Sequence, residues 1–239
     1  MPQTDWGWLI TEEELRTWIL FEDDTLLVVN KPGLVVCHPS KQGPWSSLVG
    51  ACREYLGVAR LHMPSRLDRE TSGVVVLAKN AELGSRLQRA IEHRQVEKVY
   101  HGLLCGRLEQ EVIVDQPIGK AEDSAVVIKR GVAAGGQEAS TVFTPLEYRN
   151  GLTLARIAPR TGRLHQIRVH AAWLGMPIAG DKIYGPDEQL FLEFREHGWT
   201  PRHATLLPYP RQALHASEWR CPSVGLSFTA PLPRQEWNW

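Results

Sequence analysis

The chain has 239 residues, of which 43% are hydrophobic and 23% charged, and its formal net charge at pH 7 is zero. This composition is typical of a soluble globular enzyme, and no apolar run approaches the ~20 residues that a helix needs to cross a bilayer. The N-terminus shows no basic segment followed by an apolar one, so no secretory signal is expected and the predicted location is the cytoplasm. The four cysteines form no C-x-x-C pair, so neither a zinc knuckle nor a redox dithiol is predicted.

The predicted elements alternate between short strands and helices along the whole chain. Helices are predicted from Thr11, at 48–56, at 81–94, at 164–173 and at 187–196. Strands are predicted at 26–29, 34–36, 74–78, 98–104, 112–114, 125–129, 140–147, 152–158, 213–215 and 226–228, with a loop from residue 38 and a flexible loop at 131–136. This order indicates an α+β fold with a central mixed, mostly antiparallel sheet flanked by helices and loops. No shift in composition marks a linker, so one continuous domain is predicted.

The charges are unevenly distributed. Residues 1–24 hold seven acids and one base, and the rest of the chain carries 26 Lys and Arg against 20 Asp and Glu. Residues 148–180 contain five arginines, two histidines and no acid. Solvated faces usually mix both signs, whereas phosphate contacts need a patch of one sign. The pattern therefore favours an anionic partner.

The segment 65–73 places Asp68 immediately before the apolar run 74–78, which predicts a buried strand. A single aspartate in such a segment is usually a turn or cap residue. Here Arg66 and Arg69 flank it, and a nearby guanidinium favours the ionised carboxylate. An ionised carboxylate at the mouth of a buried strand could serve as a nucleophile or a base.

The acid-free block contains a tight turn at 160–163 and a predicted helix that starts at Leu164. Arg168 lies at the edge of the buried stripe of that helix, so it needs a carboxylate partner, for which Asp68 is the candidate. Arg163, at the helix start, suits a phosphate. His165 and His170 are five residues apart and face different ways, which argues against a metal pair.

Tyr100 lies on a predicted strand and faces the same way as Gly102. A glycine beside a tyrosine on a sheet face predicts open space above the ring. Ordinary sheet packing is one interpretation of Tyr100, and a stacking platform for a flat base is the other.

At these residues the chain resembles a known family. Residues 66–73 resemble the RLD-x-x-TSG motif of RluA-type pseudouridine synthases. Residues 160–170, followed by 175–178, 180–181 and 184–185, resemble the same family's RTGR-x-HQIR-x-H…G-x-PI-x-GD-x-x-YG block. Lys98-x-Tyr100 matches a third motif, and 26–33 and 212–216 resemble the family's edge segments. The resemblance covers about residues 20–233.

The resemblance implies an enzyme that isomerises uridine in rRNA or tRNA to pseudouridine, with an active-site cleft across the sheet. It implies that Asp68 is the catalytic carboxylate, that Tyr100 stacks on the uracil and that Arg168 pairs with Asp68. The residues expected to contact RNA are Arg66, Arg69, Thr71, Arg160, Arg163, His165 and Gln166. RNA is the expected partner, and no cofactor, metal or membrane is expected. The protein is expected to be a monomer.

Two departures from the family pattern bear on this interpretation. Ser65 stands where the family usually has histidine, so the contacts of that histidine are in question. Residues 1–20 are predicted to be an N-terminal extension and 21–239 the catalytic domain, without the small N-terminal RNA-binding domain of many relatives. The alternatives are a catalytically silent RNA-binding module on the same fold and, less favoured, a hydrolase that uses Asp68 with a histidine.

Overall fold

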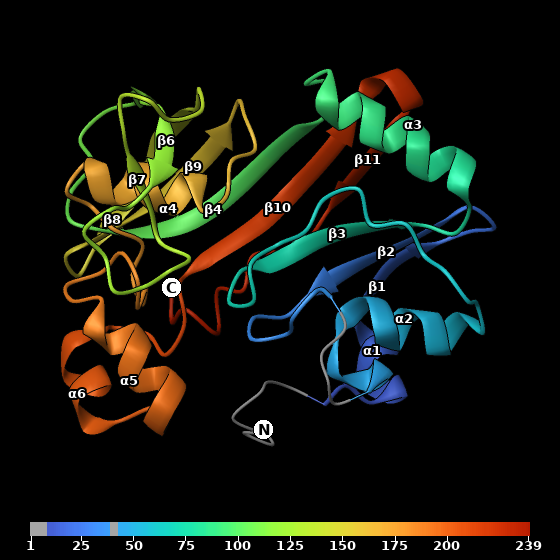
Figure 1. Cartoon of the computed structure of the whole chain (residues 1–239), viewed down its shortest axis with the longest axis horizontal. Coiled ribbons are helices and arrows are strands. Elements are labelled where there is room, and N and C mark those ends of the chain that lie inside the picture. Colours follow the sequence, from blue (N-terminus) through green and yellow to red (C-terminus); the bar gives the residue numbers. More distant parts are fainter. Residues whose placement is uncertain (1–8, 39–42) are drawn as a thin grey trace. The chain divides into compact units, whose positions relative to one another are not determined.

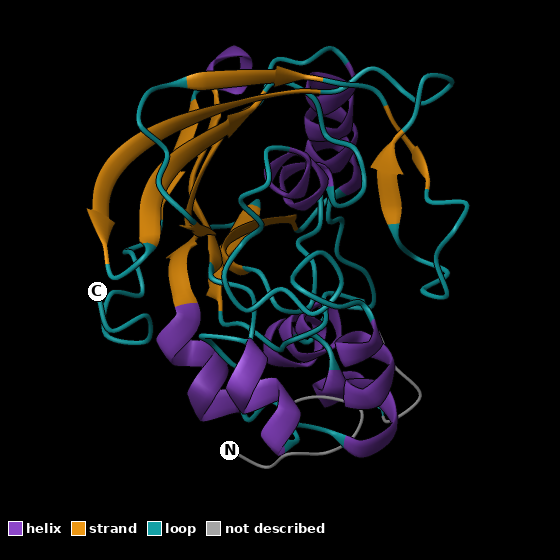
Figure 2. Cartoon of the chain, turned by 90° about the vertical axis from the view of Figure 1, so that its left-hand side faces the viewer, coloured by secondary structure: helices purple, strands orange, loops and turns teal. Residues whose placement is uncertain are grey.

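The computed structural model describes residues 9–38 and 43–239. The chain divides into two compact units (Figure 1). Unit 1 comprises the residues up to Lys98 together with Ala216–Leu232, and unit 2 comprises Val99–His215 together with Pro233–Trp239. Helices and strands are interspersed in the chain (Figure 2), which confirms the predicted α+β class. The predicted division at residue 20 is a different one and stays a prediction.

The strands of unit 1 lie in a sheet whose central strands are buried and whose edge strands are partly exposed. Its strands are β1 (Ile19–Glu22), β2 (Leu26–Lys31), β3 (Ser72–Ala78), β10 (Leu214–Cys221) and β11 (Leu226–Thr229), in that order. The pairs β1–β2, β2–β3 and β10–β11 are antiparallel. Every residue of β3 is buried, as its uninterrupted apolar sequence predicts for a strand covered on both sides.

Three helices cover this sheet. They are α1 (Glu12–Trp18), α2 (Leu48–Leu56) and α3 (Ala81–Glu92), and Figure 1 shows α3 on one side of β2 and β3 and α1 and α2 on the other. Leu87 of α3 packs with Val28 and Val76 in one core cluster. All three helices are capped at their start: the side chains of Thr11, Ser47 and Asn80 each accept a hydrogen bond from a backbone N–H of the first turn.

The strand predicted at 34–36 is wrong. Leu34 has a φ of 72°, which belongs to a turn and not to a strand. The carbonyl of Val35 accepts from the ammonium of Lys31, and that of Val36 accepts from the N–H of Leu48. Neither of these hydrogen bonds belongs to the pairing of two strands. The loop predicted from residue 38 lies mostly outside the described residues.

Four strands of unit 2 pair antiparallel. Their order is β4 (Glu97–Cys105), β9 (Leu152–Pro159), β8 (Ser140–Arg149) and β5 (Val112–Asp115), and β6 (Ile118–Lys120) pairs separately with β7 (Arg130–Val132). Helix α4 (Gln166–Trp173) packs Ile167 and Ala171 against Leu104 on one face. Trp237 packs against Leu103, whose side chain points to the opposite face. The sheet core is thus closed on both sides.

The strand predicted at 125–129 is also wrong, because this β-branched run forms turns. The side chains of Val127 and Ile128 are 79% and 45% exposed. The backbone N–H of Ala125 and the ammonium of Lys129 both bind the carboxylate of Glu188, so the segment is held by a distant residue and not by a ladder. The strands lie on either side of it, as β6 and β7, and β7 occupies part of the predicted loop at 131–136.

The last third of the chain holds α5 (Gln189–His197), α6 (Pro201–Leu206), a 3₁₀ turn (Pro222–Val224) and the strands β10 and β11. Helix α6 was not predicted, although Thr200 followed by Pro201 is a helix-start signal. Helix α4 begins two residues later than predicted, since His165 has a φ of 58°. Among the described residues, no helix is long and apolar enough to cross a membrane.

Candidate active site

The loop that carries Asp68 is fixed through its backbone carbonyls. The carbonyl of Leu67 accepts from the thiol of Cys37 at 3.3 Å, and that of Asp68 accepts from the N–H of Thr71 at 3.2 Å. The carbonyl of Arg69 accepts from the Lys31 ammonium at 3.1 Å. Burial raises the pKa of the Cys37 thiol, so the thiol keeps the proton that it donates. Three successive carbonyls are held, and the half-buried Asp68 side chain projects from a defined backbone.

Lys31 is the main support of this loop. Its side chain is 0% exposed, and its ammonium also donates to the carbonyls of Pro32 and Val35, at 2.9 Å each. A buried ammonium is costly unless its N–H groups are bonded. Lys31 therefore joins the turn after β2 to the Asp68 loop.

Gly73 allows β3 to start directly behind this loop. It has a φ of 115°, and a Cβ atom there would lie 2.1 Å from the carbonyl oxygen of Ala216. Both the conformation and the close approach require glycine. The backbone structure alone therefore explains why the motif has glycine at this position, without any contact to RNA.

Three residues near Asp68 were predicted to contact RNA, and their environments differ. Arg66 is exposed. Arg69 is half-buried and its Nε donates to the carbonyl of Leu34 at 3.3 Å, whereas Thr71 is buried. Of the three, Arg66 has the environment best suited to a phosphate. RNA contact by all three stays a prediction.

In unit 2, the turn at 160–163 is held by the amide of Gln166. Its Oε1 accepts from the hydroxyl of Thr161 at 2.7 Å and from the N–H of Arg163 at 3.0 Å. Its Nε2 donates to the carbonyl of Ser140 and the hydroxyl of Thr141, at 2.9 Å each. The amide is buried and all four of its hydrogen-bonding positions are used. Direct RNA contact by Gln166 stays untested, but its observed contacts fix the turn that carries Arg160 and Arg163.

The hydrogen-bond chain continues to His170. The Nε2 of His170 lies 3.0 Å from the carbonyl of Gln116, which can only accept, so Nε2 carries the proton. Nδ1 then accepts from the hydroxyl of Thr141 at 2.9 Å. Burial lowers the pKa of His170 and favours this neutral form. His165 points elsewhere and contacts Tyr184, so the prediction that the two histidines face different ways is confirmed.

Replacing Gln166 by leucine should destabilise the protein by about 2 kcal/mol, because the buried Ser140 and Thr141 and the half-buried Thr161 and Arg163 would lose the amide that binds them. Urea denaturation followed by circular dichroism measures this change. Gln88→Leu is the matched control, since Gln88 is exposed on α3 and its amide donates to the side chain of Glu92. It should change the free energy of unfolding by less than about 0.5 kcal/mol. Equal stability of the two variants would contradict a structural role for Gln166.

Arg168 is buried on α4 and paired within unit 2. Its Nε and Nη2 donate to the carboxylate of Asp181 at 2.6 and 2.9 Å. Its guanidinium also lies over the ring of Tyr184, 5.0 Å from the centroid. The expectation that this arginine needs a carboxylate is confirmed with Asp181 as a partner. The predicted pairing with Asp68 would join the two units and stays a prediction.

Tyr100 is half-buried and packs against the cluster that α4 covers. The expected open space beside it is not found at Gly102. A Cβ atom on Gly102 would meet the carbonyl of Ala213 and the side chains of Ile157 and Leu214, at 3.2 Å each. The argument from the neighbouring glycine is therefore wrong, and a stacking role for Tyr100 depends on the family resemblance.

The structure places the predicted site residues in both units. Asp68, Arg66, Arg69 and Thr71 belong to unit 1, and Tyr100, Arg160, Arg163, His165, Gln166 and Arg168 belong to unit 2. Sequence reasoning missed the supporting residues Lys31, Cys37, Asp181 and Tyr184. Asp181 and Tyr184 lie in the GD-x-x-YG segment, which was noted as a motif without roles for these two side chains.

The family model of RNA pseudouridylate synthase matches residues 25–173, which include the Asp68 loop, Tyr100 and the whole of α4. The chain belongs to the RNA pseudouridylate synthase family. The predicted resemblance is thereby confirmed, and the family consists of RNA isomerases.

Curated relatives agree with this assignment to the pseudouridylate synthase family. The ribosomal large subunit pseudouridine synthase D of Nitrosomonas europaea is 36% identical over 92% of this chain and 63% of its own length. The protein of the same name from Vibrio vulnificus is 34% identical over 90% and 67%, and the uncharacterized RNA pseudouridine synthase YjbO of Bacillus subtilis is 36% identical over 91% and 69%. The chain thus spans about two thirds of the length of these relatives.

Solved pseudouridylate synthase structures share the fold. Human RNA pseudouridylate synthase domain containing 4 superposes with a TM-score of 0.72 at 26% identity, covering 94% of this chain and 92% of that one. Human RNA pseudouridylate synthase domain containing 1 gives 0.73 at 24% identity, covering 98% and 87%.

Proposed function

We propose that the protein is an RNA pseudouridine synthase that isomerises one or more uridines of an RNA to pseudouridine. The observation that carries this proposal is the family match, which spans the motif of Asp68 and continues into α4. Ribosomal RNA is the first candidate substrate, because several relatives are named for the large ribosomal subunit, and transfer RNA is the second.

In this proposal Asp68 is the catalytic carboxylate, and the fixed backbone of its loop supports that role. The reaction breaks the bond between the ribose and the uracil nitrogen N1 and forms a bond from the same ribose carbon to carbon five. Carbon five loses a proton and N1 gains one, so the product is an isomer of uridine. No atom enters from outside, so neither a cofactor nor a metal is needed. Attack on the ribose, attack on the uracil and assistance of a glycal route are the three alternative roles of Asp68.

Tyr100 and Arg168 complete the proposed catalytic set. Tyr100 stacks on the target uracil, which must be turned out of its helix because the reacting bond lies inside the stack. Arg168 pairs with the Asp68 carboxylate. Arg66, Arg160 and Arg163 bind phosphates, and the protein acts as a monomer in the cytoplasm.

The test is pseudouridine mapping of total RNA from cells with and without the gene, by chemical derivatisation and primer extension. Mass alone cannot detect the product, because uridine and pseudouridine are isomers. We expect at least one site to disappear on deletion and to return with the wild-type gene. If every site persists, the protein is not the synthase for any mapped RNA, and a silent RNA-binding module becomes the better interpretation.

A further inference from the structure

Asp181 directly follows the acid-free block 148–180, and its side chain accepts several hydrogen bonds. Its carboxylate is 0% exposed and accepts four bonds, two from Arg168 and two from backbone N–H groups. The backbone donors are Ile183 at 2.9 Å and Tyr184 at 3.1 Å, both to Oδ1. The backbone of its own turn therefore fixes the carboxylate independently of the arginine.

The turn itself admits little movement. Gly180, directly before Asp181, has a φ of 79°, and a Cβ atom there would lie 2.2 Å from the carbonyl oxygen of Arg211. Burial raises the pKa of Asp181, but the charge of Arg168 and the four hydrogen bonds outweigh burial and hold the pKa below its usual value. The carboxylate is thus ionised at neutral pH and forms a true ion pair.

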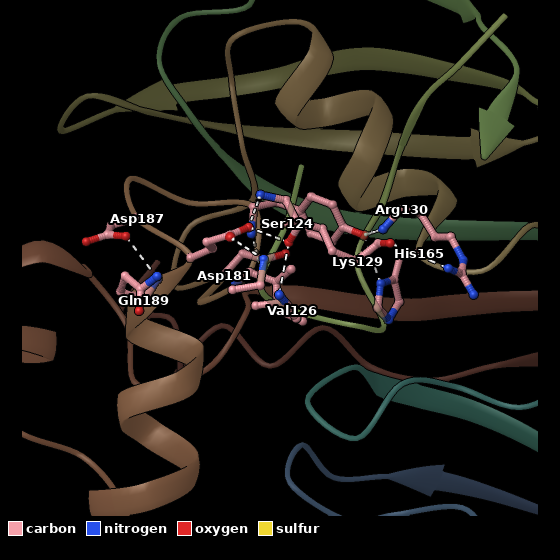
Figure 3. A network of polar contacts seen from close by, with 12 residues as sticks. Ser124, Val126, Lys129, Arg130, His165, Asp181, Asp187 and Gln189 are labelled. Atoms are coloured by element: carbon pink, nitrogen blue, oxygen red, sulfur yellow. Dashed lines mark hydrogen bonds and ion pairs between the residues drawn. The ribbon is translucent and has the colours of Figure 1, made fainter. Parts of the chain in front are cut away.

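A second contact fixes the plane of the guanidinium. The guanidinium of Arg168 lies over the ring of Tyr184, whose hydroxyl accepts from the backbone N–H of Arg130 at 2.9 Å and lies 2.9 Å from Nδ1 of His165. Figure 3 labels Arg130, His165 and Asp181 in this network of polar contacts. Tyr184 is therefore held at its far end. Arg168 is clamped along one edge by Asp181 and against one face by Tyr184.

We propose that Asp181 is a positioning residue for the reaction, which fixes the Nε–Nη2 edge of Arg168 so that the other N–H groups point in one direction at the reacting centre. The inference rests on the proposed function, in which Arg168 serves that centre. An arginine has many rotamers, and a guanidinium that is oriented before the substrate binds need not be ordered during the reaction.

Asp181→Asn tests this proposal in the full-length protein. The amide keeps the size of the carboxylate but offers one acceptor atom, so it can hold only one of the two Arg168 bonds. We expect kcat on the identified RNA to fall about 100-fold with KM within about threefold, since orientation and not affinity is lost.

Glu188→Gln is the matched control. Glu188 is another carboxylate hub of unit 2, which accepts from Ser124, Ala125 and Lys129. Its partners belong to the segment 124–129 and not to α4, so its variant should keep kcat within about threefold of wild type. If Asp181→Asn is as active as Glu188→Gln, or if it changes KM and leaves kcat unchanged, the positioning role is overturned.

A double variant keeps the proposal testable if Asp181→Asn fails to fold. Arg168→Met with Asp181→Asn removes both buried charges, so no unpaired ion remains. Because Asp181 is proposed to act through Arg168, the double variant should match Arg168→Met alone in single-turnover rate. A further drop of about tenfold or more would show that Asp181 acts by itself and would overturn the inference. A wild-type protein that forms no pseudouridine overturns the proposed function instead.

Discussion

Asp68→Asn should lower pseudouridine formation by about 10⁴-fold or more, because an amide can serve neither as a nucleophile nor as a base. The free energy of unfolding should change by less than about 2 kcal/mol, since the loop is held through its carbonyls by Cys37, Thr71 and Lys31. Single-turnover assays on the mapped RNA and urea denaturation measure the two quantities.

Glu70→Gln is the control for this variant. It makes the same carboxylate-to-amide change two residues away, at a variable position of the motif, on a side chain that is also half-buried. It should retain activity within about threefold. An Asp68→Asn protein that keeps more than about a tenth of wild-type activity would remove Asp68 from the catalytic role.

Lys31→Met should have the largest effect on stability, about 3 to 4 kcal/mol. The thioether fills a similar volume but donates nothing, so the carbonyls of Pro32, Val35 and Arg69 would be left without this donor. Because one of these carbonyls belongs to the Asp68 loop, we expect kcat to fall about tenfold or more even where the protein remains folded.

Lys79→Met provides the comparison. Lys79 also belongs to unit 1 and binds Glu22 at 2.9 Å, but both side chains are partly exposed. Removing such a pair should cost less than about 1 kcal/mol. The denaturation midpoints of the two variants, measured side by side, show whether the destabilisation is specific to Lys31 or follows from the loss of a lysine in general. Equal midpoints would contradict a supporting role for Lys31.

The sequence predicted well wherever neighbouring residues decide the structure. Thr11, Ser47 and Asn80 cap helices because each accepts from a backbone N–H three residues away. The apolar run at 74–78 forms a buried strand, as an uninterrupted run of mostly β-branched residues predicts. The motif residues around Asp68 and Arg168 also stood out, since charged groups beside apolar runs need an explanation.

The predictions that were wrong or incomplete share a different cause. In each case the structure depends on a contact with a residue distant along the chain. The β-branched run at 125–129 is a good strand by propensity, but Glu188 binds its backbone from 63 residues away. Burial of Arg168 predicted a carboxylate partner, yet it could not indicate that Asp181 is one. No neighbouring residue indicates the supporting role of Lys31, because its contact with Arg69 spans 38 residues. Tertiary contacts of this kind leave no local pattern.

The discontinuity of unit 1 has a consequence for its assembly during synthesis. Gly73 of β3 lies against the backbone of Ala216 in β10, and the residues between them include all of Val99–His215. A ribosome therefore makes the Asp68 loop early but delivers β10 only after most of unit 2 has emerged. Until then β3 presents an unpaired apolar edge, which is prone to associate with other chains. Synthesis of unit 1 therefore begins first, but the unit is completed only after Val99–His215 has been made. Protection of the β3 edge in the nascent chain then depends on how quickly this part of unit 2 emerges.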